Sequence, residues 1–456
     1  MKKSLIILFS TQIVFAQSIS QKLETGTKAL MNSDAAISSS LSFYVADESG
    51  QVIYDYQGNK GLSTASTQKI FTAAAVLGTL GKDYTYQTNG SYTGTIANGT
   101  ISGDLYIKSN GDPSLGSWRY EGFKPENFQK QFLEAVKKLG VKKVVGNLII
   151  DDSYYDHQTI PGGWPWDDLG NYYGAGVWGV NWRENQFDVN IYGKDIKSFS
   201  YPLANISWLN DLKAAGSSDQ SLIFTAPHSN VALINGSLPA GKLSTVSGSV
   251  SNPPLQLGLE VEKWLKSEGI EIGGRLVSSS MLEIEGKPLS DFPDNTIFFS
   301  YKSPTLDKMV YWFLRKSINM YGESFIKTLA KEKTGNPSFK NGVEYLKKYW
   351  ISKGINSNMI NFADGSGLSP QNYVSAKAEV QALLFAKKQS WFTTFYDGFP
   401  TQDNGMKMKS GTMRDTKSYA GYHTSKEGKK YVYSIIINNY KGSGGAELQK
   451  ILTLLK

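Results

Sequence analysis

Cysteine is absent from the 456 residues of this chain, and histidine occurs only three times, as His157, His228 and His423. Disulfide bonds, and a lipid anchor on an N-terminal cysteine, are therefore not expected. The histidines have no spacing such as His-x-x-x-His, so a zinc site and a Ser-His-Asp triad both lack support. We expect no metal and no cofactor, and a nucleophile in this chain needs a base other than histidine.

Long apolar segments are also missing. Near the N-terminus, Lys2 and Lys3 precede a short apolar run over residues 5–9, and Ala16 closes a second short run. Both runs fall well short of the roughly 20 apolar residues of a membrane-spanning helix. The pattern instead predicts a signal peptide over residues 1–16, cleaved after Ala16, and hence a protein exported to the periplasm.

Charge and composition give broader limits. The net charge is +8, and no basic run lies beside a recognition motif, so we expect no nucleic-acid partner. A mildly basic surface favours an anionic polymer such as the cell wall, but it equally fits ordinary solvated lysines. The length predicts about two to four folded domains, and no pattern indicates an oligomeric state.

Three short motifs occur in a fixed order: Ser66-Thr67-Gln68-Lys69, Ser317-Ile318-Asn319 and Lys409-Ser410-Gly411. A Ser-x-x-Lys string alone is weak, because roughly three or four arise by chance in a chain of this length. A second one, Ser324-Phe325-Ile326-Lys327, is in fact present, and we assign it to a helix that follows Ser317. The ordered combination of the three motifs predicts a serine acyl-transfer enzyme.

The first motif supplies a nucleophile and a base. Ser66 and Lys69 are three residues apart at the start of an apolar helical pattern, so both project from one helix face. With no histidine nearby, Lys69 is the candidate base for the Ser66 hydroxyl. A lysine acts as a base near neutral pH only when its pKa is lowered, either by burial or by a second cation such as Lys409.

The other two motifs supply groups that hold the substrate. In a short turn between helices, Ser317 can relay a proton to the leaving amine, and Asn319 can hold the substrate amide. The third motif is expected on an edge strand, where it offers a charge, a hydroxyl and a close backbone approach from Lys409, Ser410 and Gly411. Backbone N–H groups of Ser66 and Thr412 are the expected oxyanion donors.

The periodicity of apolar residues predicts a β-hairpin over residues 41–56, a buried helix after Ser66, and a C-terminal strand and helix that pack on the same sheet. Between them lies β-rich material with Gly, Asn and Asp turns, and Pro253-Pro254 opens a helix that ends at Gly269. The expected domains are a catalytic domain over residues 17–83 and 290–456, an inserted β-rich domain over 84–194 and 276–289, and a nested smaller domain over 195–275.

Nearly the whole expected mature chain resembles a known family, the class C, low-molecular-mass penicillin-binding proteins, which are the D-alanyl-D-alanine carboxypeptidase/endopeptidases of peptidase family S13. The resemblance implies a mixed α/β fold of the α+β kind. An antiparallel sheet flanked by helices, as in penicillin-binding proteins and serine β-lactamases, carries nested β-rich inserted domains. The strings that carry the resemblance are Ala65-Ser66-Thr67-Gln68-Lys69, Gly111-Asp112-Pro113, Gly163-Trp164-Pro165-Trp166-Asp167-Asp168, Lys316-Ser317-Ile318-Asn319, Asp364-Gly365-Ser366-Gly367-Leu368-Ser369 and Lys409-Ser410-Gly411-Thr412.

The resemblance also implies a reaction. Ser66 would attack the carbonyl of the penultimate D-alanine of a peptidoglycan stem peptide, or of the D-alanine in a cross-link, and water would release the acyl-enzyme. Penicillins and other β-lactams would acylate the same serine and inhibit the enzyme. Asp168 matches a position that faces the diaminopimelate side chain in relatives, and Tyr173 matches an aromatic residue beside it.

Three positions depart from the family pattern. Ile318 stands where many relatives have Asp, Pro370 where some have Arg, and Arg414, also expected to contact substrate, where some have Gln. The balance between carboxypeptidase and endopeptidase action therefore stays open. Two alternatives also stay open: a β-lactamase or esterase on the same scaffold, and a non-catalytic peptidoglycan-binding protein.

Overall fold

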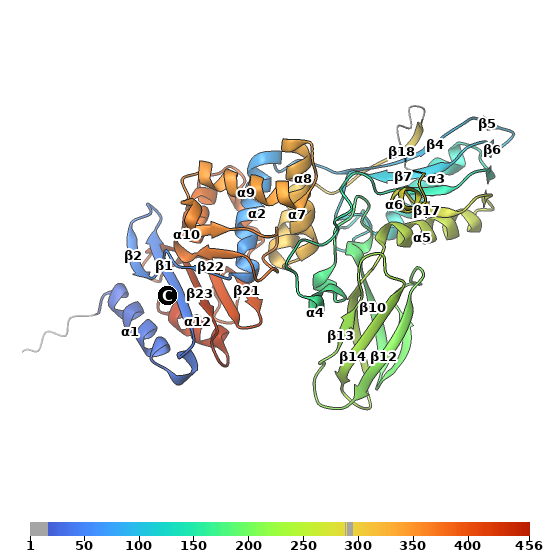
Figure 1. Ribbon diagram of the computed structural model, residues 1–456. Coiled ribbons are helices and arrows are strands. Elements are labelled where there is room, and N and C mark those ends of the chain that lie inside the picture. Colours follow the sequence, from blue (N-terminus) through green and yellow to red (C-terminus); the bar gives the residue numbers. More distant parts are fainter. Residues whose placement is uncertain (1–16, 288, 290–294) are drawn as a thin grey trace, which may run out of the picture.

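The computed structural model describes residues 17–287, 289 and 295–456, so the expected signal peptide over residues 1–16 lies outside the described residues. The chain forms two lobes (Figure 1). Residues 17–83 and the C-terminal third of the chain build one lobe, and the middle of the chain builds the other, which carries a projecting pair of small sheets. Among the helices in the described ranges, none has the length and apolarity needed to cross a membrane.

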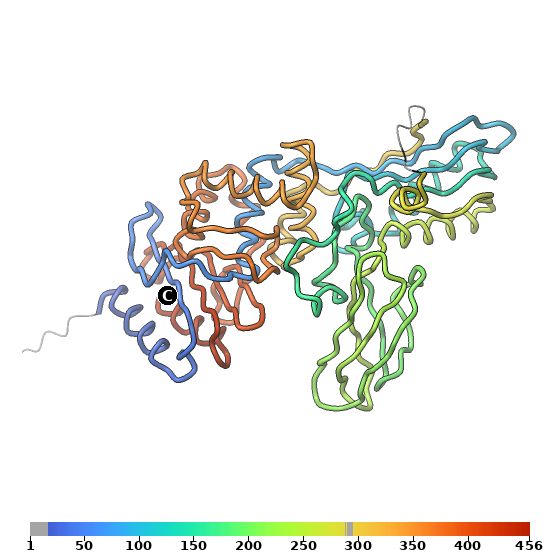
Figure 2. Tube along the Cα trace, in the orientation of Figure 1, coloured from blue at the N-terminus to red at the C-terminus, as the bar shows by residue number. Residues whose placement is uncertain are grey.

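The first lobe, called the catalytic lobe below, is built on a five-stranded antiparallel sheet in the order β2-β1-β23-β22-β21. The N-terminal hairpin therefore lies beside the C-terminal strands, as the blue and red segments show in Figure 2. The expected hairpin and the expected C-terminal strand are both present. The strands are β1 (Ser40–Asp47), β2 (Val52–Tyr56), β21 (Met408–Met413), β22 (Thr416–Thr424) and β23 (Lys430–Asn438).

Helices cover both faces of this sheet, because alternate residues of its central strands are apolar on each side. Val432 and Ile436 of β23 pack towards α2, α8 and α10, whereas Tyr433 and Ile435 pack towards α1 and α12. The helices of the lobe are α1 (Ile19–Met31), α2 (Lys69–Leu80), α7 (Leu306–Arg315), α8 (Asn319–Thr334), α9 (Phe339–Ser352), α10 (Ala376–Lys387), α11 (Phe392–Asp397) and α12 (Gly444–Thr453). A small sheet joins β3 (Gly61–Leu62), β19 (Ile360–Asn361) and β20 (Tyr373–Ser375).

The second lobe, called the insertion below, is organised around a mixed sheet in the order β17-β9-β7-β4-β18. Helices α3 and α5 pack on one face of this sheet around Phe128, Phe132 and Leu257. Its elements are β4 (Gln87–Tyr92), β5 (Ile96–Ala97), β6 (Thr100–Ile101), β7 (Leu105–Ser109), α3 (Pro125–Lys138), β8 (Lys143–Val144), β9 (Leu148–Asp151), α4 (Trp166–Leu169), α5 (Pro253–Ser267), β16 (Glu271–Ile272), β17 (Leu276–Ser278), α6 (Ser279–Ile284) and β18 (Thr296–Lys302).

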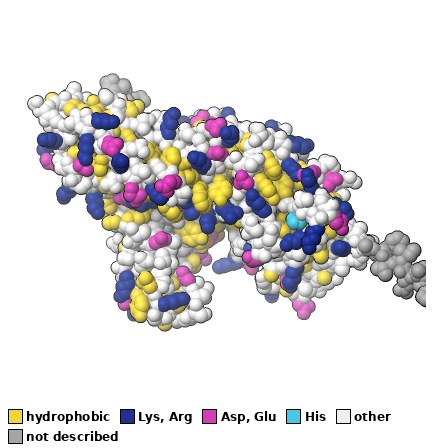
Figure 3. Space-filling view, turned by 180° about the vertical axis from the view of Figure 1, so that it is seen from behind, with side chains coloured by type: hydrophobic (Ala, Val, Ile, Leu, Met, Phe, Trp, Pro, Cys, Tyr) yellow, Lys and Arg dark blue, Asp and Glu magenta, His cyan; other side chains and the backbone are white. Residues whose placement is uncertain are grey.

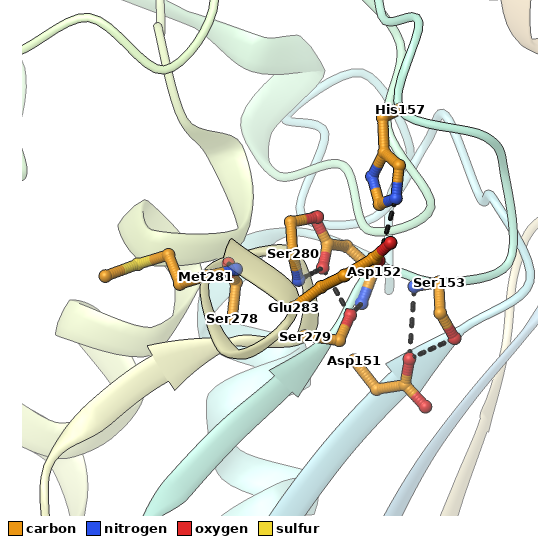
Figure 4. Close-up of polar contacts among 9 residues, drawn as sticks. All are labelled: Asp151, Asp152, Ser153, His157, Ser278, Ser279, Ser280, Met281 and Glu283. Atoms are coloured by element: carbon orange, nitrogen blue, oxygen red, sulfur yellow. Dashed lines mark hydrogen bonds and ion pairs between the residues drawn. The ribbon is translucent and has the colours of Figure 1, made fainter. Parts of the chain in front are cut away.

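Polar contacts join the two chain segments of the insertion (Figure 4). Asp152, just after β9, accepts hydrogen bonds from the hydroxyls of Ser279 and Ser280, which begin α6 127 and 128 residues later. Closer to the surface, His157 contacts Glu283 at 2.9 Å. These contacts tie α6 to the end of β9 and so close the insertion on itself.

The projecting pair of sheets, called the nested sandwich below, has the orders β11-β10-β15 and β12-β14-β13. Their inner faces share a small core that includes Phe187, Ile223 and Ile234. The strands are β10 (Gln186–Tyr192), β11 (Asp195–Phe199), β12 (Ser207–Ala214), β13 (Leu222–Phe224), β14 (Val231–Leu238) and β15 (Leu243–Ser249). Strand β13 contacts the short helix α4, which places the nested sandwich beside the cleft described next.

Candidate active site

Ser66 and Lys69 meet at the start of α2. Ser66 lies in a 3-10 turn, Ala65–Gln68, and Lys69 is the first residue of the helix. As their spacing predicts, the lysine reaches the serine: Lys69 Nζ lies 2.9 Å from Ser66 Oγ. The same nitrogen donates to Asn319 Oδ1 at 2.6 Å and to the Ser366 carbonyl at 2.7 Å. Lys69 is thus held against the hydroxyl from two other sides.

The environment of Lys69 suits it to act as a base. The side chain is fully buried, and this burial lowers its pKa to about 7. The negative charges of Asp364 and Glu323 act in the opposite direction. Burial, which is one of the two causes expected from the sequence, is therefore the main cause of the lowered pKa.

The second motif forms the turn between α7 and α8. Ser317 has a positive φ of 59°, which is uncommon for a residue other than glycine and gives the turn its sharp bend. Asn319 begins α8, and its Nδ2 donates to the Tyr173 carbonyl of the insertion at 2.8 Å. The insertion therefore contacts a residue that also binds Lys69.

The third motif lies on β21, which is an edge strand of the sheet, as expected. Lys409 Nζ donates to Ser317 Oγ at 3.0 Å and to the Ser410 carbonyl at 2.8 Å. Burial and the neighbouring Lys69 lower the pKa of Lys409. At Gly411 a Cβ atom would lie 2.2 Å from the Thr64 carbonyl oxygen, so only glycine lets β21 pack this closely on the turn that carries Ser66.

These groups surround a cleft of about 880 Å³ between the catalytic lobe and the insertion. The space-filling view shows a recess between the projecting nested sandwich and the catalytic lobe (Figure 3). Lys69 and Gly411 are not among the residues that line it. The predicted site residues that do line it are Ser66, Ser317, Asn319, Lys409, Ser410 and Thr412, with Asp168 and Tyr173 from the insertion and Arg414 just after β21.

The Asp168 and Tyr173 side chains of the insertion are partly buried. Burial raises the pKa of Asp168, while Tyr173 and the positive charge of Arg414 oppose that effect. Burial and the nearby Asp168 carboxylate raise the pKa of Tyr173. Asp168, Tyr173 and Arg414 therefore form one interacting group at the cleft.

Two acidic residues near Lys69 were not predicted as part of the site. Asp364 belongs to a string that carries the family resemblance, and no role beside Lys69 was expected for it, yet its charge acts on Lys69. Glu323 is fully buried on α8, it accepts a hydrogen bond from Gly365 N–H at 3.0 Å, and burial raises its pKa to about 8. The signal for Glu323 was its position four residues after Asn319, which places both side chains on one helix face.

The second Ser-x-x-Lys string is structural. Ser324 and Lys327 both lie inside α8 and are fully buried, as its assignment to a helix predicted. Ser324 Oγ donates to the Gly111 carbonyl at 2.9 Å, and Lys327 Nζ contacts Asp156 Oδ1 at 2.5 Å. Both contacts attach α8 to the insertion.

Comparison with known proteins gives the class. The model of the D-Ala-D-Ala carboxypeptidase 3 (S13) family matches residues 27–455, so the chain belongs to this family of serine hydrolases. The family and the enzyme class expected from the motifs are confirmed.

Individual relatives agree with this family. The chain is 25% identical over 439 residues to a D-alanyl-D-alanine carboxypeptidase of Actinomadura sp. (strain R39), covering 89% of this chain and 78% of the relative. It is 25% identical over 417 residues to the D-alanyl-D-alanine carboxypeptidase DacB of Haemophilus influenzae, covering 86% and 83%. It is also similar to a penicillin-sensitive carboxypeptidase A of Dictyostelium discoideum, with 24% identity over 73% of this chain and 65% of the relative.

Solved structures show the same fold. The crystal structure of penicillin binding protein 4 from Haemophilus influenzae superposes with a TM-score of 0.79 at 23% identity, covering 95% of this chain and 98% of that one. A second structure of that protein, complexed with a β-lactam, gives a TM-score of 0.73 at 21% identity, with the same coverage. The α+β fold class implied by the resemblance is thereby confirmed.

Proposed function

We propose that this protein is a penicillin-sensitive serine D,D-carboxypeptidase and D,D-endopeptidase that cleaves peptidoglycan stem peptides and their cross-links. The observation that carries the proposal is the buried Lys69 amine, 2.9 Å from a serine hydroxyl that faces an open cleft. Membership of a D-Ala-D-Ala carboxypeptidase family supports the substrate class. The assignment of single residues to steps of the reaction belongs to this proposal.

Acylation begins when neutral Lys69 takes the proton of Ser66. The Ser66 oxygen then attacks the carbonyl carbon of the penultimate D-alanine, and the carbonyl oxygen becomes an oxyanion held by the backbone N–H groups of Ser66 and Thr412. When the tetrahedral intermediate collapses, the peptide bond breaks and an acyl-Ser66 ester remains. The leaving amine takes its proton from Ser317, which lies 3.0 Å from Lys409 Nζ. The proton that Lys69 took from Ser66 then replaces the one lost by Ser317, so that Lys69 is neutral again before deacylation.

Deacylation uses the same groups with water as the nucleophile. Lys69 takes a proton from the water, the water oxygen attacks the ester, and Ser66 recovers its proton as it leaves. Before acylation, Lys409, with the hydroxyls of Ser410 and Thr412, binds the carboxylate of the terminal D-alanine. The carboxylate also favours the charged form of Lys409, whose pKa is lowered by burial in the free protein.

The cleft wall supplied by the insertion sets the substrate preference in this proposal. Asp168, Tyr173 and Arg414 face the space beyond the peptide bond and contact the side chain of the third stem residue. The enzyme acts after export to the periplasm, where its substrate lies. β-Lactams inhibit it by acylating Ser66. The similarity to a penicillin-sensitive carboxypeptidase of Dictyostelium discoideum supports the sensitivity to penicillin.

The first prediction tests the acyl-serine step. Intact-protein mass spectrometry after incubation with benzylpenicillin should show one stable adduct on the chain from residue 17 onward and none on Ser66→Ala. The same wild-type sample should release D-alanine from a stem pentapeptide. Rapid penicillin hydrolysis without a lasting adduct would instead identify a β-lactamase, and peptidoglycan binding without any turnover would identify a non-catalytic binder.

A further inference from the structure

Trp164 of the insertion reaches the catalytic lobe through one hydrogen bond. Its indole is almost fully buried, and Nε1 donates to Asp364 Oδ2 at 2.9 Å. The rest of the Asp364 carboxylate is held by the catalytic lobe, through the N–H groups of Gly367 and Ser369 at 2.7 and 2.6 Å and through Asn372 Nδ2 at 2.9 Å. Trp164 is thus the insertion's donor to a carboxylate that otherwise organises the turn over residues 364–369.

This turn is one of the supports of Lys69. The Ser366 carbonyl inside the turn accepts a hydrogen bond from Lys69 Nζ at 2.7 Å. Gln68, the residue before Lys69, also donates to the Asp364 carbonyl at 2.7 Å. The position of the turn therefore fixes where the Lys69 amine lies.

The other support of Lys69 is backed by the same part of the insertion. Lys69 Nζ donates to Asn319 Oδ1 at 2.6 Å, and Asn319 Nδ2 donates to the Tyr173 carbonyl at 2.8 Å. Besides Ser66, Lys69 Nζ binds Asn319 and the Ser366 carbonyl. Each of these two partners is connected to residues 164–173 of the insertion through one or two further contacts.

We propose that Trp164 is a positioning residue: acting through Asp364 and the Ser366 carbonyl, it holds the Lys69 amine against the Ser66 hydroxyl. The inference rests on the proposed acyl-serine function. It makes the insertion part of the catalytic centre as well as a wall of the cleft, because the segment that carries Asp168 also carries the anchor of the base.

Trp164 acts by fixing the position of the Asp364 carboxylate. A hydrogen bond from an indole to a buried carboxylate is charge-assisted and stronger than a neutral one. Without the indole donor, Asp364 Oδ2 keeps the Ser369 N–H alone of these two donors, so the carboxylate, the turn around it and the Ser366 carbonyl are held less firmly in place. Small misplacements of reacting groups cost up to roughly 100-fold in rate.

An electrostatic readout separates positioning from plain packing. Lys69 is faced by Asp364 from the turn, by Glu323 from α8 and by Lys409 from β21. The Trp164 N–H offsets part of the Asp364 charge, so its loss should raise the pKa of Lys69 and move the acidic limb of acylation to higher pH. Asp364→Asn removes the charge and should move the same limb to lower pH.

The test compares two substitutions of the same chemistry in the full chain. Trp164→Phe keeps the ring and removes the N–H. Trp182→Phe is the matched control, because Trp182 is also buried and its Nε1 donates to a carboxylate, Glu260, at the same 2.9 Å, but inside the insertion and away from Lys69. The second-order rate of acylation by a fluorescent penicillin is measured from about pH 5 to about pH 9, together with the melting temperature.

We expect Trp164→Phe to slow acylation roughly tenfold and to move the acidic limb upward, while Trp182→Phe loses similar thermal stability and acylates within about twofold of wild type. Equal acylation rates and pH limbs in the two variants would overturn the inference. A wild-type protein that is not acylated would overturn the proposed function itself, so the two failures are distinguishable.

Discussion

The Lys69 amine is removed from solvent but not from polar contact. Its nitrogen has three hydrogen-bond partners, Ser66 Oγ, Asn319 Oδ1 and the Ser366 carbonyl, which keep a buried polar group satisfied whether or not it is charged. Burial disfavours the ammonium form, so a large neutral fraction exists near neutral pH. A lysine can in this way do the work that histidine does in other serine hydrolases.

This gives a prediction for the pH dependence of acylation. The rate should rise with pH through a midpoint near 7, because Lys69 accepts the Ser66 proton only above its pKa of about 7. The direction follows from the amine: below the midpoint it carries a proton and cannot act as a base. The measurement is the second-order rate of acylation by benzylpenicillin against pH. A rate that stays constant from about pH 5 to about pH 9 would contradict the assignment of Lys69 as base.

At the residue scale, the sequence predicted more of the site than of its surroundings. The nucleophile, the candidate base and the two other motifs all came from short strings, because their chemistry demands particular side chains at fixed spacing. Asp364 and Glu323 were missed as neighbours of Lys69, since their effect depends on distances across the fold, and Asp364 lies 295 residues away. The main cause of the lowered Lys69 pKa likewise depends on how deeply the fold buries this side chain, which the sequence alone does not show.

Strand β21 packs tightly on the turn that carries Ser66. The virtual Cβ of Gly411 would lie 2.2 Å from the Thr64 carbonyl oxygen and 2.4 Å from Ser418 Oγ. Ser418 Oγ itself donates to the same carbonyl at 2.6 Å. The edge strand therefore has no room to accept a side chain at this position without moving away from Ser66.

We accordingly predict that Gly411→Ala lowers the free energy of unfolding by about 1–3 kcal/mol through overpacking and slows acylation by up to roughly 100-fold, because β21 carries both Lys409 and the proposed oxyanion donor Thr412. Thermal unfolding and the acylation rate measure the two effects. Gly162→Ala is the control, since no atom lies within 4 Å of its virtual Cβ. Similar behaviour of the two variants would show that the contact is not limiting.

At the scale of elements, the periodicity of apolar residues predicts individual helices and strands better than it predicts how they pair. The helix opened by Pro253-Pro254 is present as α5, but it contacts β9 and β17 of the mixed sheet. Strand β10, which begins at residue 186, pairs with β11 and β15 and therefore belongs to the nested sandwich. We therefore propose that the nested unit spans residues 186–249 rather than the expected 195–275. Pairing between strands distant in sequence leaves no local signal from which such limits can be read.

At the scale of the whole molecule, the cleft belongs to both lobes. The catalytic lobe supplies the reacting groups, and the insertion supplies Asp168 and Tyr173 on the facing wall. The family resemblance predicted that both lobes contribute residues to the cleft. The order of the three motifs alone predicts only the residues of the catalytic lobe. In the proposed function, the insertion therefore controls which substrate side chains fit, while the catalytic lobe carries out the chemistry.

This division predicts a change in substrate preference for Asp168→Asn. The kcat/KM ratio between two stem peptides that differ only at the third residue, lysine or norleucine, should fall roughly tenfold, because a charge-assisted contact to the amine is lost. Steady-state kinetics on the two peptides measure this ratio. Asp167→Asn is the control, since Asp167 also lines the cleft but is more exposed. An unchanged ratio in Asp168→Asn would remove Asp168 from substrate recognition.

The chain passes between the lobes at two points that lie side by side. Ser303 N–H donates to the Tyr86 carbonyl at 3.0 Å, and Leu306 N–H donates to the Tyr84 carbonyl at 2.8 Å. A short loop that joined residue 84 to residue 306 would therefore keep the chain of the catalytic lobe continuous without the insertion. Such a shortened chain would leave Asn319 Nδ2 without the Tyr173 carbonyl, and it would leave Asp364 Oδ2 with the Ser369 N–H but without the Trp164 indole. Removal of the insertion would therefore change the hydrogen bonding of two residues that lie beside Lys69, even though the fold of the catalytic lobe is continuous without it.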